Sequence, residues 1–124
     1  MIKVYKCEQC QSVAIEVITG ESCSEKTYKE VTANTTEASS EKHLPVVEKE
    51  GNKVTVTVGS VDHPMDYEHY IMWIFLETKC GGMLKKLNPG EKPQAVFELA
   101  EGVVPIAAYE YCNLHGLWKT EIAQ

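Results

Sequence analysis

The hydrophobic pattern of residues 43–124 constrains the fold most, because no ten-residue stretch of it has the 3.6-residue period of a helix. The segment KVTVTV, residues 53–58, alternates strictly and places its three valines on one face of a predicted strand. The segment HYIMWIFLET, residues 69–78, is apolar on both faces. Such a pattern is typical of a central strand that is buried on both sides. We therefore expect an all-β domain.

Further short strands are predicted between turn signals. The predicted turn Glu-Gly-Asn joins 44–49 to 53–58, and the remaining segments are a short strand within 81–93, then 94–99, 104–114 and 116–122. Residues 31–42 are rich in Thr, Ser, Ala and Glu, and we expect a linker or an extended surface segment there. About seven short strands without an internal repeat predict an immunoglobulin-like β-sandwich.

Length and charge exclude several classes of protein. A chain of 124 residues suits one domain, with room for a small appendage. The net charge of -6 argues against nucleic acid as a partner, and it would repel a small anion unless local positive charge offset it. No apolar run approaches the ~20 residues of a membrane span. The first residues lack the apolar core of a signal peptide, so we expect a cytoplasmic protein without a membrane partner.

The cysteines argue against a disulfide framework. There are five, an odd number, and they are widely spaced, at positions 7, 10, 23, 80 and 112. In a reducing compartment such cysteines are more often metal ligands or small buried hydrophobic residues.

The four histidines each stand at the edge of a predicted strand or in a loop. They are His43, His63, His69 and His115, and Cys112 precedes the last of them by three residues. We expect His43 to open the first strand of the sandwich. Loops at one end of a sandwich cluster in space, so these five side chains can converge on one metal ion. The alternative is that the histidines are solvated surface residues, which is the commoner role of a single loop histidine.

The number of candidate ligands bears on the metal. A structural zinc site closes at four ligands, one fewer than this set offers. Blue copper takes two histidines, a cysteine and a weak axial methionine, and no methionine occurs in the segment GLWKT after His115. Iron accepts five or six ligands, and a thiolate ligand tunes its redox chemistry strongly. These observations favour iron but leave the other two metals open.

Three segments then resemble a known family. They are EKHLPVVE at 41–48, VGSVDHPMDYEHYIMWI at 58–74 and AYEYCNLHGLWK at 108–119. Together they are similar to the superoxide reductases, the desulfoferrodoxin and neelaredoxin family, over about residues 37–124. We therefore take 37–124 as the iron-binding sandwich and 1–36 as a small N-terminal segment.

The resemblance implies a function for each residue of the set. It implies one iron per chain, with the four histidines as equatorial ligands and Cys112 as the axial thiolate. Glu41 would close the open position of the iron after oxidation, and Lys42 would attract superoxide. The implied reaction is the one-electron reduction of superoxide to hydrogen peroxide, with re-reduction by an external donor such as rubredoxin. Family members form dimers or tetramers, so we expect a homo-oligomer.

The N-terminal segment departs from the family's pattern. Desulfoferrodoxins hold a second, rubredoxin-like iron by C-x-x-C followed by an adjacent C-C pair. Here Cys7, Cys10 and Cys23 match three of these positions, and Ser24 stands at the fourth. The site is empty, or it is completed by Ser24 or water, or Cys80 supplies the last thiolate; a thiol redox pair at Cys7 and Cys10 is a further, weaker interpretation. We expect a degraded centre, a doubtful second iron, and no ligand role for Cys80.

Two other functions compete with a reductase. One is a cupredoxin-like electron-transfer protein that holds copper. The other is a non-catalytic metal-binding or interaction module. Metal content and the visible spectrum would separate all three.

Overall fold

The computed structural model describes residues 2–16 and 28–124, which belong to two compact units, Met1–Thr32 and Ala33–Gln124. The described part of the first unit is a three-stranded antiparallel sheet in the order β2-β1-β3. Its strands are β1 (Lys3–Cys7), β2 (Val13–Glu16) and β3 (Tyr28–Val31). Cys23 and Ser24 lie outside the described residues, so their predicted roles stay predictions.

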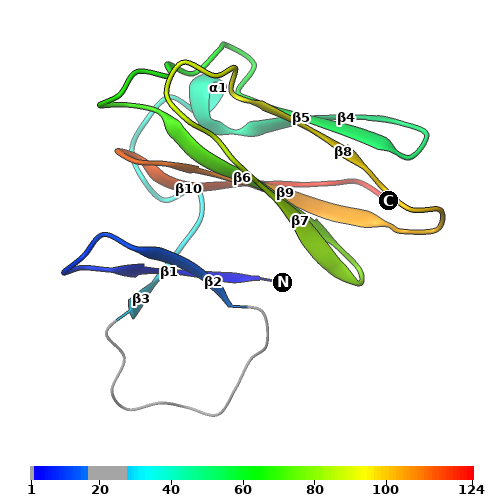
Figure 1. The fold of residues 1–124 in the computed structure, drawn as a ribbon, viewed down its shortest axis with the longest axis horizontal. Coiled ribbons are helices and arrows are strands. Elements are labelled where there is room, and N and C mark those ends of the chain that lie inside the picture. Colours follow the sequence, from blue (N-terminus) through cyan, green and yellow to red (C-terminus); the bar gives the residue numbers. More distant parts are fainter. Residues whose placement is uncertain (1, 17–27) are drawn as a thin grey trace. The chain divides into compact units, whose positions relative to one another are not determined.

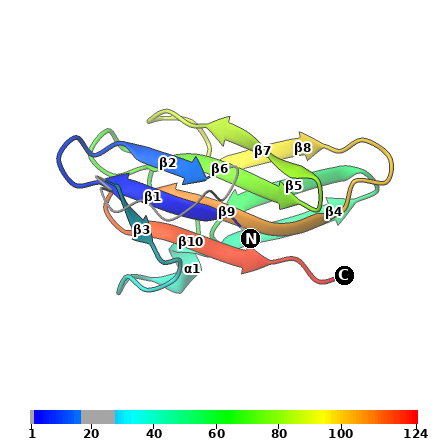
Figure 2. The same cartoon turned by 90° about the horizontal axis from the view of Figure 1, so that it is seen from below.

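The second unit is a two-layered antiparallel β-sandwich (Figures 1 and 2). One sheet has the order β10-β9-β6-β7 and the other the order β4-β5-β8. The strands are β4 (Pro45–Glu50), β5 (Lys53–Val58), β6 (Ile71–Thr78), β7 (Gly81–Lys86), β8 (Gln94–Glu98), β9 (Pro105–Cys112) and β10 (Gly116–Glu121). The predicted immunoglobulin-like sandwich of about seven strands is confirmed.

The two most informative sequence patterns correspond to β5 and β6. β5 occupies the predicted residues, and its three valines are fully buried between the sheets. β6 lies between β9 and β7, and none of its eight residues is exposed. It begins at Ile71 rather than at His69, because an isolated bridge between Asp66 and His69 ends the preceding loop there.

The hydrophobic core joins the two layers. β5 and β8 contribute Val54, Val56, Val58, Ala95 and Phe97, and the facing sheet contributes Ile71, Ile74, Leu76, Ala108 and Cys112. Burial of these apolar side chains is the main term that stabilises the sandwich. Cys112 is thus a core residue as well as a candidate ligand.

One helical turn replaces part of the predicted linker. α1 (Ser40–His43) is closed by a hydrogen bond from the Leu44 N–H to the Ser40 carbonyl, 2.9 Å. His43 therefore ends a helical turn and does not open a strand, so that expectation was wrong. The pattern gave no signal because four residues are too few to show a helical period. No described helix is long and apolar enough to cross a membrane.

Candidate metal centre

The five predicted ligands come from three places that meet at one end of the sandwich. His43 ends α1, His63 and His69 lie in the β5–β6 loop, and Cys112 and His115 flank the turn from β9 to β10. The strand register explains why they meet: Cys112 pairs with Ile71 on one side and with Gly116 on the other. The start of β6, the end of β9 and the start of β10 are therefore neighbours. The two loops and α1 bring the histidines to that edge.

The ligand atoms of these five residues all lie within 4.8 Å of one another. The Nε2 atoms of His43 and His63 are 3.1 Å apart, and His43 Nε2 is 3.1 Å from His115 Nδ1. The Cys112 sulfur lies 3.5 Å from His63 Nε2 and 3.9 Å from His115 Nδ1. Separations this short between nitrogen and sulfur atoms from separate segments are those of donors around a single ion.

Backbone carbonyls fix the orientation of two imidazoles. His43 Nδ1 is 2.7 Å from the Ser39 carbonyl oxygen, and His63 Nδ1 is 2.7 Å from the Pro64 carbonyl oxygen. Since a carbonyl only accepts, each Nδ1 carries the proton and each Nε2 keeps a free lone pair for a metal. The sequence could not identify these acceptors, because they belong to the backbone.

Burial sets the protonation of the site. Burial lowers the pKa of His63 to about 4, and it is also the main cause that lowers the pKa of His43 and of His69. These imidazoles are therefore neutral at neutral pH, as metal ligands must be. Burial raises the pKa of the Cys112 thiol, while the N–H groups of His115 and Leu114 favour its thiolate. A thiolate there needs a cation beside it.

The donor set fits a metal ion on a further observation. His69 Nε2 is buried and has no hydrogen-bond partner. A buried nitrogen without a hydrogen-bond partner destabilises the folded state unless a bound group satisfies it, and the His69 ring lies beside the rings of His63 and His115. A bound metal ion accounts for it.

Two residues that sequence reasoning did not single out hold the ligands in place. The Asn113 side chain accepts a hydrogen bond from the Tyr70 N–H at 3.0 Å and donates one to the Glu68 carbonyl at 2.9 Å. It thereby ties the β9–β10 turn to the residues on either side of His69. Trp118 stacks on His43 with ring centroids 4.9 Å apart, and its indole N–H donates to the His115 carbonyl at 3.1 Å. Both lie inside the quoted C-N-L-H-G-L-W motif.

A third such residue is Gly59, at the end of β5. Its φ is +52°, and an added Cβ would stand 2.2 Å from the Glu41 carbonyl oxygen and 2.6 Å from the Lys42 carbonyl carbon. The same Glu41 carbonyl accepts the Val61 N–H at 3.0 Å and the Ser60 hydroxyl at 3.3 Å. Only glycine lets α1 approach the β5–β6 loop this closely.

Glu41 and Lys42 lie on the same helical turn as His43, and both side chains are exposed. The positive charge of Lys42 contributes to the lowered pKa of both His43 and His69. Its field therefore reaches the ligand cluster from the solvent side.

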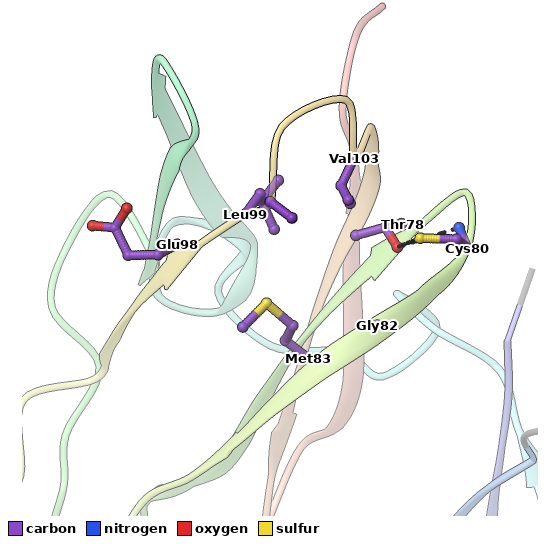
Figure 3. A pocket seen from close by; sticks show the side chains of 8 residues that line it. Thr78, Cys80, Gly82, Met83, Glu98, Leu99 and Val103 are labelled. Atoms are coloured by element: carbon purple, nitrogen blue, oxygen red, sulfur yellow. Dashed lines mark hydrogen bonds between the residues drawn. The ribbon is translucent and has the colours of Figure 1, made fainter.

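Cys80 lies apart from the ligand cluster. It follows Thr78 at the far end of β6 and lines a pocket with Thr78, Met83 and Leu99 (Figure 3). Its sulfur is 3.7 Å from the Thr78 hydroxyl. An eight-residue strand separates this pocket from the metal end of the sheet, about 25 Å at the usual rise of a strand.

These features define a class: an immunoglobulin-like sandwich with a four-histidine, one-cysteine centre for a single metal ion. The desulfoferrodoxin family model matches residues 35–121, more than half of the chain. The chain belongs to the desulfoferrodoxin family.

Individual relatives agree with this assignment. The chain is 44% identical over 124 residues to a desulfoferrodoxin of Syntrophotalea carbinolica, covering 97% of this chain and 96% of the relative. It is 38% identical over 99 residues to a superoxide reductase of Pyrococcus horikoshii, covering 66% of this chain and 86% of the relative. The crystal structure of the superoxide reductase from Treponema pallidum superposes with a TM-score of 0.80 at 37% identity, covering 98% of this chain and 99% of that one. The comparisons give no support to a cupredoxin-like or non-catalytic alternative.

Proposed function

We infer that the chain is a superoxide reductase, which reduces superoxide by one electron and yields hydrogen peroxide. The observation that carries this conclusion is the convergence of His43, His63, His69, His115 and Cys112 within 4.8 Å. Relatives named superoxide reductase, and one solved structure that matches nearly the full length, support it.

Iron is the metal that this donor set fits best. Five donors exceed the four of a structural zinc site. A blue-copper centre would use a methionine sulfur, but the Met65 sulfur accepts the Ile71 N–H at 3.3 Å and belongs to the core packing. When bound, iron supplies the electron that reduces superoxide. The four imidazoles and the Cys112 thiolate would hold it.

Lys42 gives the site a local positive charge. Superoxide is an anion, and the net charge of the chain is -6, so attraction at the site has to come from nearby cations. Lys42 is exposed, it precedes a ligand directly, and its charge acts on two ligands. We assign it the role of drawing superoxide to the open side of the centre.

Glu41 shares that helical turn, and its carboxylate is exposed. We propose that this carboxylate occupies the open side of the centre after product has left. The Glu41 backbone carbonyl accepts hydrogen bonds from Val61 and Ser60, and these bonds limit how far the helical turn can move. The side chain therefore has to supply the movement.

Cys112 is fully buried, and its position shapes the chemistry of the centre. A thiolate donates electron density to a bound metal, which favours release of an anionic product. The two N–H groups from the following turn stabilise the negative charge on sulfur and limit this donation.

Four further expectations remain part of the proposal. An external donor of rubredoxin type returns the electron, and the protein works as a homo-oligomer. The N-terminal segment, 1–36, carries a degraded metal centre at Cys7, Cys10 and Cys23. Free cysteines, among them the exposed Cys10 and Cys80, suit a reducing compartment, and we place the protein in the cytoplasm.

The test compares two cysteine variants of the full chain. Wild-type protein prepared anaerobically should contain one iron per chain, develop a thiolate-to-iron absorption band on oxidation, and consume superoxide without releasing oxygen. Cys112→Ser should lose the band and the activity, whereas the matched control Cys80→Ser should keep both. Absence of iron, oxygen release at the rate of superoxide loss, or full activity in Cys112→Ser would contradict the assignment. A second iron would contradict the degraded N-terminal centre alone.

A further inference from the structure

The N-terminal unit places two thiols in one tight turn. Cys7 is the buried last residue of β1, and Cys10 is exposed three residues later. We propose that Cys7 and Cys10 form a dithiol that hydrogen peroxide oxidises to an intramolecular disulfide, with Cys10 as the attacking thiol. This goes beyond the iron reaction, to which it is linked only through the peroxide that the reaction produces.

The backbone of the turn holds the two residues together. The Cys10 N–H donates to the Cys7 sulfur at 3.4 Å. The Cys7 N–H donates to the Ser12 carbonyl at 2.9 Å, and the Gln11 N–H donates to the Cys7 carbonyl at 3.1 Å. Gln11 has a φ of 62°, a left-handed conformation that non-glycine residues rarely adopt outside tight turns. These hydrogen bonds hold Cys7 and Cys10 in one tight turn.

The two thiols differ in the way that a dithiol reaction requires. Cys10 is open to solvent, and its sulfur lies 3.1 Å from the Ser12 hydroxyl. Hydrogen bonds from Ser12 and Cys7 lower the pKa of Cys10 to about 7, so about half of it is thiolate at neutral pH. Cys7 is buried, so it meets peroxide less readily but remains beside Cys10. An exposed, ionised thiol with a buried partner is typical of a redox pair.

The chemistry balances without any other reagent. The Cys10 thiolate attacks one oxygen of hydrogen peroxide, the O–O bond breaks, and with one proton the other oxygen leaves as water. Cys10 is then a sulfenic acid. The Cys7 sulfur attacks the Cys10 sulfur, the S–O bond breaks, and a second water leaves. The two thiols lose two electrons to the peroxide, and a small-molecule dithiol reductant reverses the change.

The sequence offers a direct readout, because Glu8 lies between the two cysteines. The iron-loaded, oxidised full chain is treated with one equivalent of hydrogen peroxide, alkylated in acid, and cleaved after glutamate. A Cys7–Cys10 disulfide joins peptides 1–8 and 9–16, whereas Cys23 falls in the separate peptide 22–25. We expect the joined pair, which a dithiol reductant separates. Peptide 22–25 joined to either of them, or a metal that stays bound to the pair with both thiols unoxidised, would overturn the proposal.

Rates supply the second measurement, with the cysteine of a short unstructured peptide as the reference thiol. Such a thiol is only ~3% thiolate at pH 7, so Cys10 has roughly 15-fold more thiolate. The lower intrinsic nucleophilicity of a less basic thiolate reduces this advantage to about threefold. We expect Cys10 to react about three times faster than the reference thiol; equal or slower reaction would contradict its role.

Two variants separate the roles of the cysteines. In Cys7→Ser, Cys10 should stop at the sulfenic acid, which a dione reagent traps, and no joined peptides should form. In Ser12→Ala, the reaction of Cys10 should slow toward the rate of the reference peptide thiol. Superoxide consumption should be unchanged in both variants, because the metal centre belongs to the other compact unit. Adding peroxide directly keeps this test independent of the reductase activity, and joined peptides in Cys7→Ser would refute the pairing.

Discussion

Gly59→Ala is expected to damage the metal centre without touching a ligand. The alanine Cβ would lie 2.2 Å from the Glu41 carbonyl oxygen and 2.8 Å from the Lys42 Cα. These are backbone atoms, so no side-chain rotation relieves the clash. α1 has to move away from the end of β5, and His43 moves with it because it ends the same helical turn.

The size of the effect follows from these distances. Real Cβ contacts essentially never fall below 3.0 Å, so the carbonyl has to shift by at least 0.8 Å. That shift weakens the two hydrogen bonds from Val61 and Ser60 to the Glu41 carbonyl, each worth about 1 kcal/mol. The left-handed backbone adds about 1–2 kcal/mol for alanine. We expect a loss of about 3 kcal/mol in stability and a 10- to 100-fold loss of metal affinity, as when a group that orients a ligand is removed.

Gly51→Ala is the matched control. Gly51 has a φ of +62°, but nothing lies within 4 Å of an added Cβ. It shares the backbone strain and lacks the clash. Urea unfolding of the metal-free proteins and competition with a chelator give the two quantities. If Gly59→Ala binds iron as tightly as Gly51→Ala and is equally stable, the argument that this glycine positions α1 is wrong.

Three further predictions concern polar side chains. Asn113→Ala should lower iron affinity about 10- to 100-fold, because it removes the two hydrogen bonds that hold the residues on either side of His69. The control Asn34→Ala removes a similar pair of hydrogen bonds to the Lys119 backbone and should leave iron affinity unchanged; equal losses in the chelator competition would contradict this. Because burial lowers the pKa of His63 to about 4, the unfolded chain binds more protons than the folded chain below pH ~6.5. The stability of the metal-free protein, measured by urea titration, should therefore fall between about pH 6.5 and 4, and it should fall less in His63→Gln. Burial raises the pKa of Glu110, whose two carboxyl oxygens have no hydrogen-bond partner, so the folded state keeps this proton to higher pH than the unfolded state. Stability should therefore fall as the pH rises above ~4.3, and Glu110→Gln should remove this fall; an unchanged pH profile in the variant would refute the prediction.

The sequence by itself determined the strands of the sandwich and the identity of the ligands. Alternation in β5 and the two-sided apolar pattern of β6 are local properties, and both strands are found where the pattern predicts them, to within two residues. The five ligands were predicted from residue chemistry and from a family resemblance. Neither residue chemistry nor family resemblance requires a three-dimensional structure, since both depend only on the types and the order of the residues.

Only the tertiary structure decided how those ligands are held. The helical turn that carries His43 is too short for a periodic signal, and it forms where Gly59 leaves room for it. The acceptors for His43 and His63 are main-chain carbonyls, which every residue has, so no residue type marks them. Asn113 orients the loop of His69 across 43 and 45 positions of sequence. Local preferences determine strands, but the geometry of a metal site depends on contacts between segments that only folding brings together.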